Sequence, residues 1–217
     1  MKKYELTNET KTLAGGTVLH RIRAFRDIPR FGVKAGELGG FVEGENNLSQ
    51  DGDAWVSGDA EVSGDAEVSG GAEVYGNAKV FGIAKVYGNA RVFGNARVSD
   101  DAEVYDDAEV YGDAEVSGIA KVYGNAEVYG DAEVYGGAEV SANSDYMVVK
   151  NIWSSGRWFT YTSSNKKWAV GCFYGTGEEL VAKAYKDSKL SGKCYEAIVH
   201  AVETIEAAKA EAIGGTE

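Results

Sequence analysis

The stretch 123–140 reads YGNAEVYGDAEVYGGAEV, which is one six-residue unit written three times. The same unit, x-Gly-Asx-Ala-charged-Val, continues with little change through residues 51–141. Val recurs at every sixth residue from Val56 to Val140, fifteen times in all, and an Ala stands two residues before each Val. A repeat with so short and constant a period predicts a stacked architecture in which each unit packs on its neighbours.

Each hexad predicts one short strand followed by one corner. Alternate residues of a strand face the same side, so Ala and Val point inward together and the charged residue between them points outward. The Gly-Asx pair suits the corner, because Gly and Asn adopt positive φ at little cost. The core of this region is therefore expected to be a continuous column of Ala and Val.

This period resembles the hexapeptide repeat of left-handed parallel β-helices. In that family three hexads make one triangular coil, so residues eighteen apart stack on each other. One set of outward residues at that spacing alternates in sign: Glu67, Lys85, Glu103, Lys121 and Glu139. Opposite charges would then face each other on adjacent coils. The resemblance implies a mainly β chain with a left-handed parallel β-helix of about five coils.

The residue before each Gly forms two aromatic columns at the predicted edges of the coils. The first column is Tyr75, Phe93, Tyr111 and Tyr129, and the second is Tyr87, Tyr105 and Tyr123. Stacked rings could serve only to stiffen the corners. An exposed aromatic strip could instead bind a protein partner or another subunit. Ile83 and Ile119 interrupt the Asx position two coils apart, either as tolerated corner residues or as a contact point.

Acidic charge is concentrated in the repeat. The 217-residue chain carries a net charge of −12, whereas residues 51–141 alone carry −14. Such a surface repels nucleic acid and anionic membranes, and it attracts basic proteins, including those that bind DNA. The candidate binding residues on the outward acidic positions are Glu109, Glu115, Glu127 and Glu133. A basic group in the middle of the repeat, Lys79, Lys85, Arg91 and Arg97, argues against simple mimicry of a nucleic acid.

We expect three parts in the chain. Residues 1–50 form an N-terminal cap, residues 51–141 the β-helix, and residues 142–217 a small α+β module. Three antiparallel strands of the module are predicted over residues 145–153, 157–163 and 167–175. The pattern Thr176-x-x-Glu179 is a capping box that begins a first helix. A second helix is predicted after Ser191, with one apolar face made of Tyr195, Ile198, Val199, Val202 and Ile205.

Residues 34–56 resemble the first segment of the YdcK-type bacterial and phage β-solenoid proteins. The residues that carry this resemblance are Val33, Lys34, Gly36, Gly39, Gly40, Phe41, Val42, Leu48, Ser49, Gly52 and Trp55. The run VGCFYGTGEEL (170–180) is similar to modules of phage-encoded polymer-forming-type solenoids. The resemblance implies a phage or prophage origin. Proteins of this kind are described as acyltransferases by analogy of fold, which does not establish a function.

The sequence contains no pattern that indicates a reaction. A β-helix acyltransferase needs a general base within reach of its nucleophile, but the two histidines, His20 and His200, fall outside the coils. The spacing of Cys172 and Cys194 matches no zinc site, and no phosphate-binding loop is present. We therefore predict no catalytic residue, no metal and no cofactor. The N-terminus lacks the apolar run of a signal peptide and no segment is long and apolar enough to span a membrane, which predicts a cytoplasmic protein.

These observations favour a non-catalytic binding or scaffold protein that acts through protein–protein interaction. Its partner is expected to be a bacterial host or defence protein, which can be one that binds nucleic acid. The acidic surface of this chain is expected to inhibit that partner. The resemblance implies a homo-oligomer, either a trimer or a dimer. Two alternatives stay open: an acyltransferase with a site between subunits, and a protein that sequesters a nucleotide stacked on Tyr or Phe.

Overall fold

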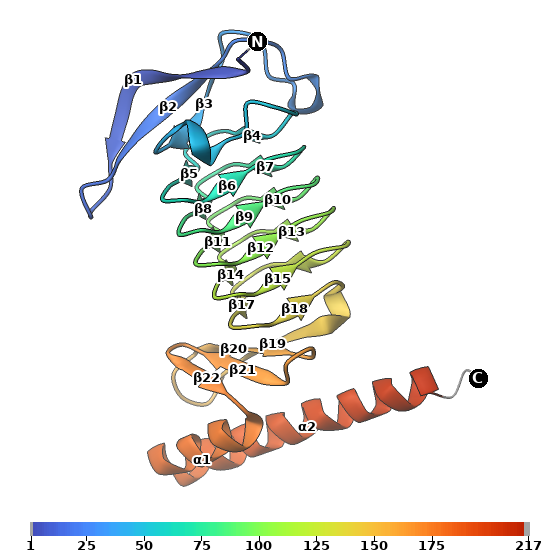
Figure 1. Ribbon diagram of the computed structural model, residues 1–217. Coiled ribbons are helices and arrows are strands. Elements are labelled where there is room, and N and C mark those ends of the chain that lie inside the picture. The colour runs from blue at the N-terminus through green and yellow to red at the C-terminus, as the bar shows by residue number, and fades with distance from the viewer. Residues whose placement is uncertain (1, 215–217) are drawn as a thin grey trace. The chain divides into compact units, whose positions relative to one another are not determined.

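The computed structural model describes residues 2–214. The chain divides into two units, Met1–Asp145 and Tyr146–Glu217. The first unit is a β-solenoid of about 6 turns with a hairpin at its N-terminal end (Figure 1). The second unit is an antiparallel sheet with two helices. The predicted mainly β class, with stacked parallel coils and an α+β module, is confirmed.

The coils are built from fifteen strands of two residues, each formed by the Val of one hexad and the residue before it, which is charged in every strand except the first, where it is Trp55. They are β4 (Trp55–Val56), β5 (Glu61–Val62), β6 (Glu67–Val68), β7 (Glu73–Val74), β8 (Lys79–Val80), β9 (Lys85–Val86), β10 (Arg91–Val92), β11 (Arg97–Val98), β12 (Glu103–Val104), β13 (Glu109–Val110), β14 (Glu115–Val116), β15 (Lys121–Val122), β16 (Glu127–Val128), β17 (Glu133–Val134) and β18 (Glu139–Val140). Every third strand joins the same parallel sheet, so the coil is three-sided.

The strands pair in the register that the eighteen-residue spacing predicts. Glu67 lies opposite Lys85, Lys85 opposite Glu103, and the alternation continues down the same sheet. Every repeat Ala and Val from Ala54 to Val140 is fully buried at 0% exposure. The interior is thus the predicted column of small apolar side chains.

Corners depend on residues with positive φ. The Gly of the hexad has φ between +63° and +74° at the corners from Gly58 to Gly136. Asp100 and Asp106 occupy the same position with φ of 58°. Each of these carboxylates accepts a hydrogen bond from the backbone N–H of the glycine one coil below, Gly118 and Gly124 respectively. These bonds help to stabilise a conformation that is otherwise costly for a residue with a Cβ atom.

The cap extends the solenoid instead of only covering it. Strands β1 (Tyr4–Thr12), β2 (Val18–Ala24) and β3 (Leu38–Val42) are antiparallel, and β3 then pairs in parallel with β5. Leu48 forms a bridge to Val68, so the cap supplies a further partial turn. For this reason the solenoid has about 6 turns where the hexads alone predicted about five. Short 3-10 helices lie at Pro29–Phe31, between β2 and β3, and at Glu45–Asn47, after β3.

Two glycines allow β3 to approach the first coil. A Cβ atom on Gly39 would lie 2.6 Å from the Val56 carbonyl oxygen, and one on Gly40 would lie 2.8 Å from the Ala60 carbonyl oxygen. Neither distance can accommodate a side chain. The Gly-Gly pair of the cap is therefore explained by close backbone packing.

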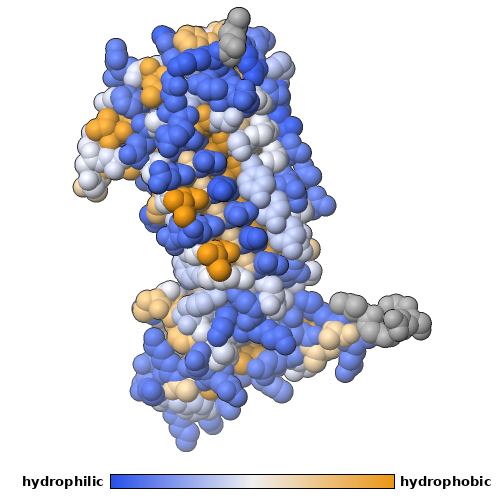
Figure 2. All heavy atoms as spheres, viewed as in Figure 1, coloured by the Kyte–Doolittle hydropathy of each residue, from blue (hydrophilic) through white to orange (hydrophobic). Residues whose placement is uncertain are grey.

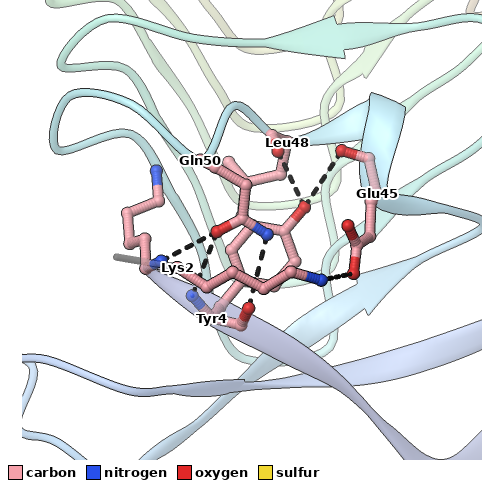
Figure 3. A network of polar contacts seen from close by, with 6 residues as sticks. Lys2, Tyr4, Glu45, Leu48 and Gln50 are labelled. Atoms are coloured by element: carbon pink, nitrogen blue, oxygen red, sulfur yellow. Dashed lines mark hydrogen bonds and ion pairs between the residues drawn. The ribbon is translucent and has the colours of Figure 1, made fainter.

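Polar side chains of the cap pair with backbone groups at the open end of the coils (Figure 3). The Tyr4 hydroxyl donates to the Leu48 carbonyl oxygen at 2.7 Å, and Gln50 receives the backbone N–H of Lys3 at 2.8 Å. The buried Lys3 ammonium donates to the Ala54 carbonyl oxygen, also at 2.7 Å. These bonds satisfy backbone groups that an uncovered end would expose.

The second unit contains four strands, not the three predicted. They are β19 (Tyr146–Lys150), β20 (Trp158–Thr162), β21 (Lys167–Val170) and β22 (Phe173–Gly175), preceded by a 3-10 helix at Asn143–Asp145. The last two come from the single segment 167–175 that was predicted as one strand. Gly171, with φ of 55°, turns the chain back within that segment.

Two helices complete this unit. Helix α1 (Gly177–Asp187) begins at the predicted capping box, in which Thr176 accepts from the Glu179 backbone N–H at 3.2 Å. Helix α2 (Lys189–Gly214) begins three residues before the predicted start. Val199 and Val202 on its predicted apolar face are buried, whereas Ile205, predicted on the same face, is 43% exposed, because it lies beyond the part of the helix that packs on the rest of this unit. Neither described helix carries an apolar stretch sufficient to cross a membrane.

Candidate functional site

The solenoid presents three faces, each with two outward columns of side chains. We name them after one residue of each: the Glu109 face (β4, β7, β10, β13, β16), the Lys85 face (β6, β9, β12, β15, β18) and the Lys79 face (β5, β8, β11, β14, β17). On every face the first column is the charged residue of the hexad. The second column is the residue after Val, which is two positions further and points the same way.

The Glu109 face carries the longest aromatic ladder. Ring centroids are 4.7 Å apart between Tyr75 and Phe93, 4.8 Å between Phe93 and Tyr111, and 5.3 Å between Tyr111 and Tyr129. Neighbouring rings are within 12° of parallel. Tyr129 at the end of the ladder is 49% exposed. The stacking follows from identical positions on successive coils, and it leaves ring edges and the last ring open to solvent.

Arg91 neutralises the acidic charge on the N-terminal half of this face. Its guanidinium donates to Glu109 at 3.0 Å and to the Tyr75 hydroxyl at 2.7 Å, and it lies 3.6 Å from Glu73. It also lies 5.4 Å from the ring centroids of both Tyr75 and Phe93, a cation–π distance. Burial raises the pKa of Glu73, and the charge of Arg91 offsets only part of that effect. Sequence reasoning did not find this cluster, because only the eighteen-residue register brings its members together.

The C-terminal half of the Glu109 face, called its lower half below, is an acidic and aromatic surface. The Tyr111 hydroxyl donates to the Glu127 carboxylate at 3.0 Å. Burial and then this hydrogen bond raise the pKa of Tyr111. Glu127 lies directly opposite Glu109 in the register, so two like charges stack on adjacent coils. Stacked carboxylates of this kind repel each other, and a cationic partner would relieve that repulsion.

The other candidate residues lie on the remaining two faces. Tyr87, Tyr105 and Tyr123 form a second stack on the Lys85 face, with centroids 5.0 and 5.2 Å apart. Glu115 and Glu133 stack on the Lys79 face. The structure therefore brings six of the eleven predicted binding residues together on the Glu109 face. These six are Tyr75, Phe93, Tyr111, Tyr129, Glu109 and Glu127.

A comparison with protein families agrees with this geometry. The family described as YdcK beta solenoid repeat matches residues 84–100, which run from the β8–β9 corner to the β11–β12 corner. The chain is a hexapeptide-type β-solenoid protein. No curated protein matches it significantly. The match and the stacked coils establish the fold of this β-solenoid protein, and its function has to be argued from its surfaces.

Charge is distributed along the β-solenoid in bands. Residues 51–74 carry seven acidic residues and no basic one, and residues 75–98 carry four basic residues and no acidic one. Residues 99–140 then carry twelve acidic residues and one base, Lys121. Because each coil takes eighteen residues, these blocks become a basic band between two acidic bands. The lower acidic band contains Glu109 and Glu127, together with Tyr111 and Tyr129.

The second unit of the β-solenoid protein contains a groove of about 860 Å³ between α1 and α2. Its floor is apolar, with Val181 and Val199, and its rim carries three glutamates, Glu178, Glu196 and Glu203. His200 is exposed on α2 and lines this groove. The spacing of Glu196, His200 and Glu203 at intervals of four and three residues already placed them on one helix face. His20 lies elsewhere, on β2, with its Nδ1 3.2 Å from the Thr7 carbonyl oxygen.

Proposed function

We propose that this chain is a non-catalytic binding protein that engages a basic protein partner through its Glu109 face. The observation that carries the proposal is the ladder Tyr75–Phe93–Tyr111–Tyr129, whose second half, Tyr111 and Tyr129, lies beside Glu109 and Glu127 in the lower acidic band. Aromatic side chains are enriched at protein interfaces, where they bury a large area at low entropic cost. Complementary charge speeds the encounter and selects the partner.

The stiffness of the solenoid supports a role in binding. Each coil is fastened to the next by a continuous set of backbone hydrogen bonds, so the face is ordered before any partner arrives. A partner with basic patches, such as a nuclease or another DNA-binding protein of the cytoplasm, fits the charge of this face. The proposed outcome is inhibition, because the nucleic-acid-binding surface of the partner would be occupied.

The test compares two hydrogen-bonded Tyr–Glu pairs on different faces. Tyr111 donates to Glu127 on the Glu109 face at 3.0 Å, and Tyr135 donates to Glu115 on the Lys79 face at 2.9 Å. The double variants Tyr111→Ala/Glu127→Gln and Tyr135→Ala/Glu115→Gln remove the same groups. Each protein is immobilised, exposed to bacterial lysate over a range of salt concentrations, and its retained proteins are identified by mass spectrometry.

We expect the unaltered chain to retain one basic protein in stoichiometric amount, with retention falling as salt increases. The Tyr111/Glu127 variant should lose at least ~10-fold of this binding, an effect typical of a central aromatic contact, and the Tyr135/Glu115 variant should keep it. Equal losses in both variants, or retention that does not depend on salt, would refute the proposal.

The second candidate function is acyl transfer, and the groove beside His200 is the observation that favours it. A histidine at the edge of an apolar groove could act as general base for an amine or hydroxyl substrate. Acetyl-CoA would be offered with a panel of amines and sugars. Turnover that disappears in His200→Ala and persists in His20→Ala would support this function, and inactivity of the unaltered chain would dismiss it.

A further inference from the structure

The Lys85 face differs from the other two in the order of its charges. Its outward column alternates strictly as Glu67, Lys85, Glu103, Lys121 and Glu139. An alternating column is self-complementary, because a copy that is turned end over end and shifted by one coil sets a counter-charge opposite each charge of the four coils that overlap. The columns of the other two faces contain adjacent like charges, namely Glu109 with Glu127 and Glu115 with Glu133.

Lys85 and Lys121, the lysines of this face, form no ion pair within the described residues. On the other faces the cations lie close to neighbouring glutamates, with Lys79 at 2.9 Å from Glu61 and Arg91 at 3.0 Å from Glu109. Within the described residues 2–214, neither Lys85 nor Lys121 has a carboxylate oxygen within 4.0 Å. Both ammonium groups are therefore available to carboxylates of a partner.

Apolar groups border the alternating column on this face. Tyr87, Tyr105 and Tyr123 form a flat stack beside it. At the corner where the face begins, Ile83 is 48% exposed and Ile119 is 65% exposed. The space-filling view shows such hydrophobic groups as isolated patches on a largely hydrophilic solenoid (Figure 2). Tyrosines and isolated isoleucines among neutralising charges form the kind of surface that two copies can share.

We propose that the Lys85 face binds a second copy of this chain, with the two solenoids antiparallel about a two-fold axis. The two-fold axis is perpendicular to the solenoid axis and passes midway between the coil of Glu103 and the coil of Lys121. Lys85 then meets the partner's Glu139, and Glu103 meets the partner's Lys121. The two-fold symmetry repeats both contacts, which gives four ion pairs between the copies. This inference goes beyond the proposed function, since it uses a different face and a different partner.

The charges and the corner residues together select this register. An axis at the height of Glu103 would oppose Lys85 to the partner's Lys121, which is repulsive. An axis between Lys85 and Glu103 would satisfy the charges but would set both isoleucines against partner carboxylates, Ile83 against Asp101 and Ile119 against Asp65. In the proposed register only Ile119 faces an aspartate, the partner's Asp101. Ile83 meets the partner's Gly137, where a Cβ atom would lie 3.7 Å from the Ile119 side chain, so the two isoleucines come close to each other.

The size of the contact predicts a weak and salt-sensitive dimer. The register overlaps four coils, which span ~19 Å at the usual strand spacing. A face of this height is smaller than the faces of stable dimers, so association is expected to be transient. Ion pairs at an exposed face are screened by salt, so dimerisation should fall as ionic strength rises.

The decisive experiment is a charge exchange between Lys85 and Glu139, followed by sedimentation velocity at low salt. These residues are three coils apart in one chain, so they do not contact each other within it. Lys85→Glu and Glu139→Lys should each weaken self-association at least ~10-fold, because each creates two repulsive contacts per dimer. An equimolar mixture of the two variants should associate as tightly as the unaltered chain, because the mixed dimer restores every ion pair.

Lys186→Glu is the matched control, since it makes the same change in net charge on α1 in the other unit. Circular dichroism checks that each variant folds, and Ile83→Ser provides a second, uncharged probe that should also weaken association. An unaltered chain that stays monomeric at low salt would overturn the proposal. So would a mixture that associates no better than the single variants, as expected if the copies pack in parallel or in another register.

Discussion

Lys3 is the residue whose surroundings are least usual in this solenoid. Its side chain is fully buried, and its ammonium donates to the Ala54 carbonyl oxygen at 2.7 Å. Burial, and after it the nearby charge of Arg26, lower the pKa of Lys3, and although Asp53 and Asp51 oppose this the pKa is about 8. The residue satisfies a backbone group at the end of the coils at the cost of desolvating a charge.

This arrangement predicts an unusual dependence of stability on pH. The pKa of Lys3 is lower in the folded chain than in the unfolded chain, so the unfolded chain binds more protons between the two values. Stability should therefore rise as pH increases from about 8 toward 10, by at most ~3 kcal/mol. Urea unfolding at several pH values measures this. Lys3→Met should abolish the rise, whereas Lys2→Met, which changes an exposed lysine, should leave it in place.

Substitutions of two corner glycines distinguish two costs of adding a side chain, namely the strain of a positive φ and crowding against the next coil. Gly94 and Gly130 have φ of 71° and 67°, so alanine is strained equally at both. A Cβ atom on Gly94 would lie 3.0 Å from the Gly112 backbone nitrogen, whereas one on Gly130 would have nothing within 4 Å. Both substitutions should lower the free energy of unfolding by ~1 kcal/mol for the φ strain. Gly94→Ala should cost more than Gly130→Ala in thermal unfolding, and equal costs would show that crowding between coils is negligible.

At the scale of the element, one coil is stable only through its neighbours. Each two-residue strand of the middle coils pairs with a strand one coil above and one coil below, as β11 does with β8 and β14, and the Ala and Val of its hexad fill a shared interior. No coil could bury this surface alone, since a short strand has too little apolar area. A defect in a middle coil should therefore spread along the stack.

Val98→Asp tests this coupling. It places a carboxylate in the fully buried column at a site where no cation can reach it. We expect a loss of at least ~4 kcal/mol and unfolding of several coils together. Hydrogen exchange detected by mass spectrometry should show reduced protection well beyond residue 98. Ser99→Asp adds the same charge at the next, half-buried position and should change stability by less than ~1 kcal/mol; protection lost only next to Val98 would contradict the coupling.

At the scale of the whole molecule, the chain has two cores. The Ala and Val column serves the first unit, and a cluster around Phe159, Trp168 and Val199 serves the second. Three of the four tryptophans, Trp153, Trp158 and Trp168, belong to the second unit. Tryptophan fluorescence thus reports mainly on that unit.

Two cores predict two unfolding transitions. Phe159→Ala removes a ring that is fully buried against Trp153 and Tyr195, which should cost ~3–5 kcal/mol. The fluorescence transition should move to lower urea concentration, while the transition of the β-sheet signal in circular dichroism should stay in place. Val98→Asp should have the converse effect. Transitions that move together in both variants would mean that the two units unfold as one.

The sequence by itself determined the solenoid. A six-residue period with Ala and Val in fixed places allows only one way to bury every apolar side chain, and the alternating signs from Glu67 to Glu139 already indicated the eighteen-residue coil. The capping box at Thr176 was equally readable, because capping depends on residues close in sequence.

Tertiary structure alone decided the rest. The extra partial turn from the cap depends on β3 meeting β5, a contact between distant segments that no local pattern encodes. The turn at Gly171 split a strand that its residue types favoured throughout. The candidate residues are divided among three faces, and Arg91 lies between Tyr75 and Glu109 on one of them. This arrangement follows only when the side of the coil that each hexad occupies is known. Local propensity specifies the strands and corners, whereas burial of backbone and charge in three dimensions specifies which of them meet.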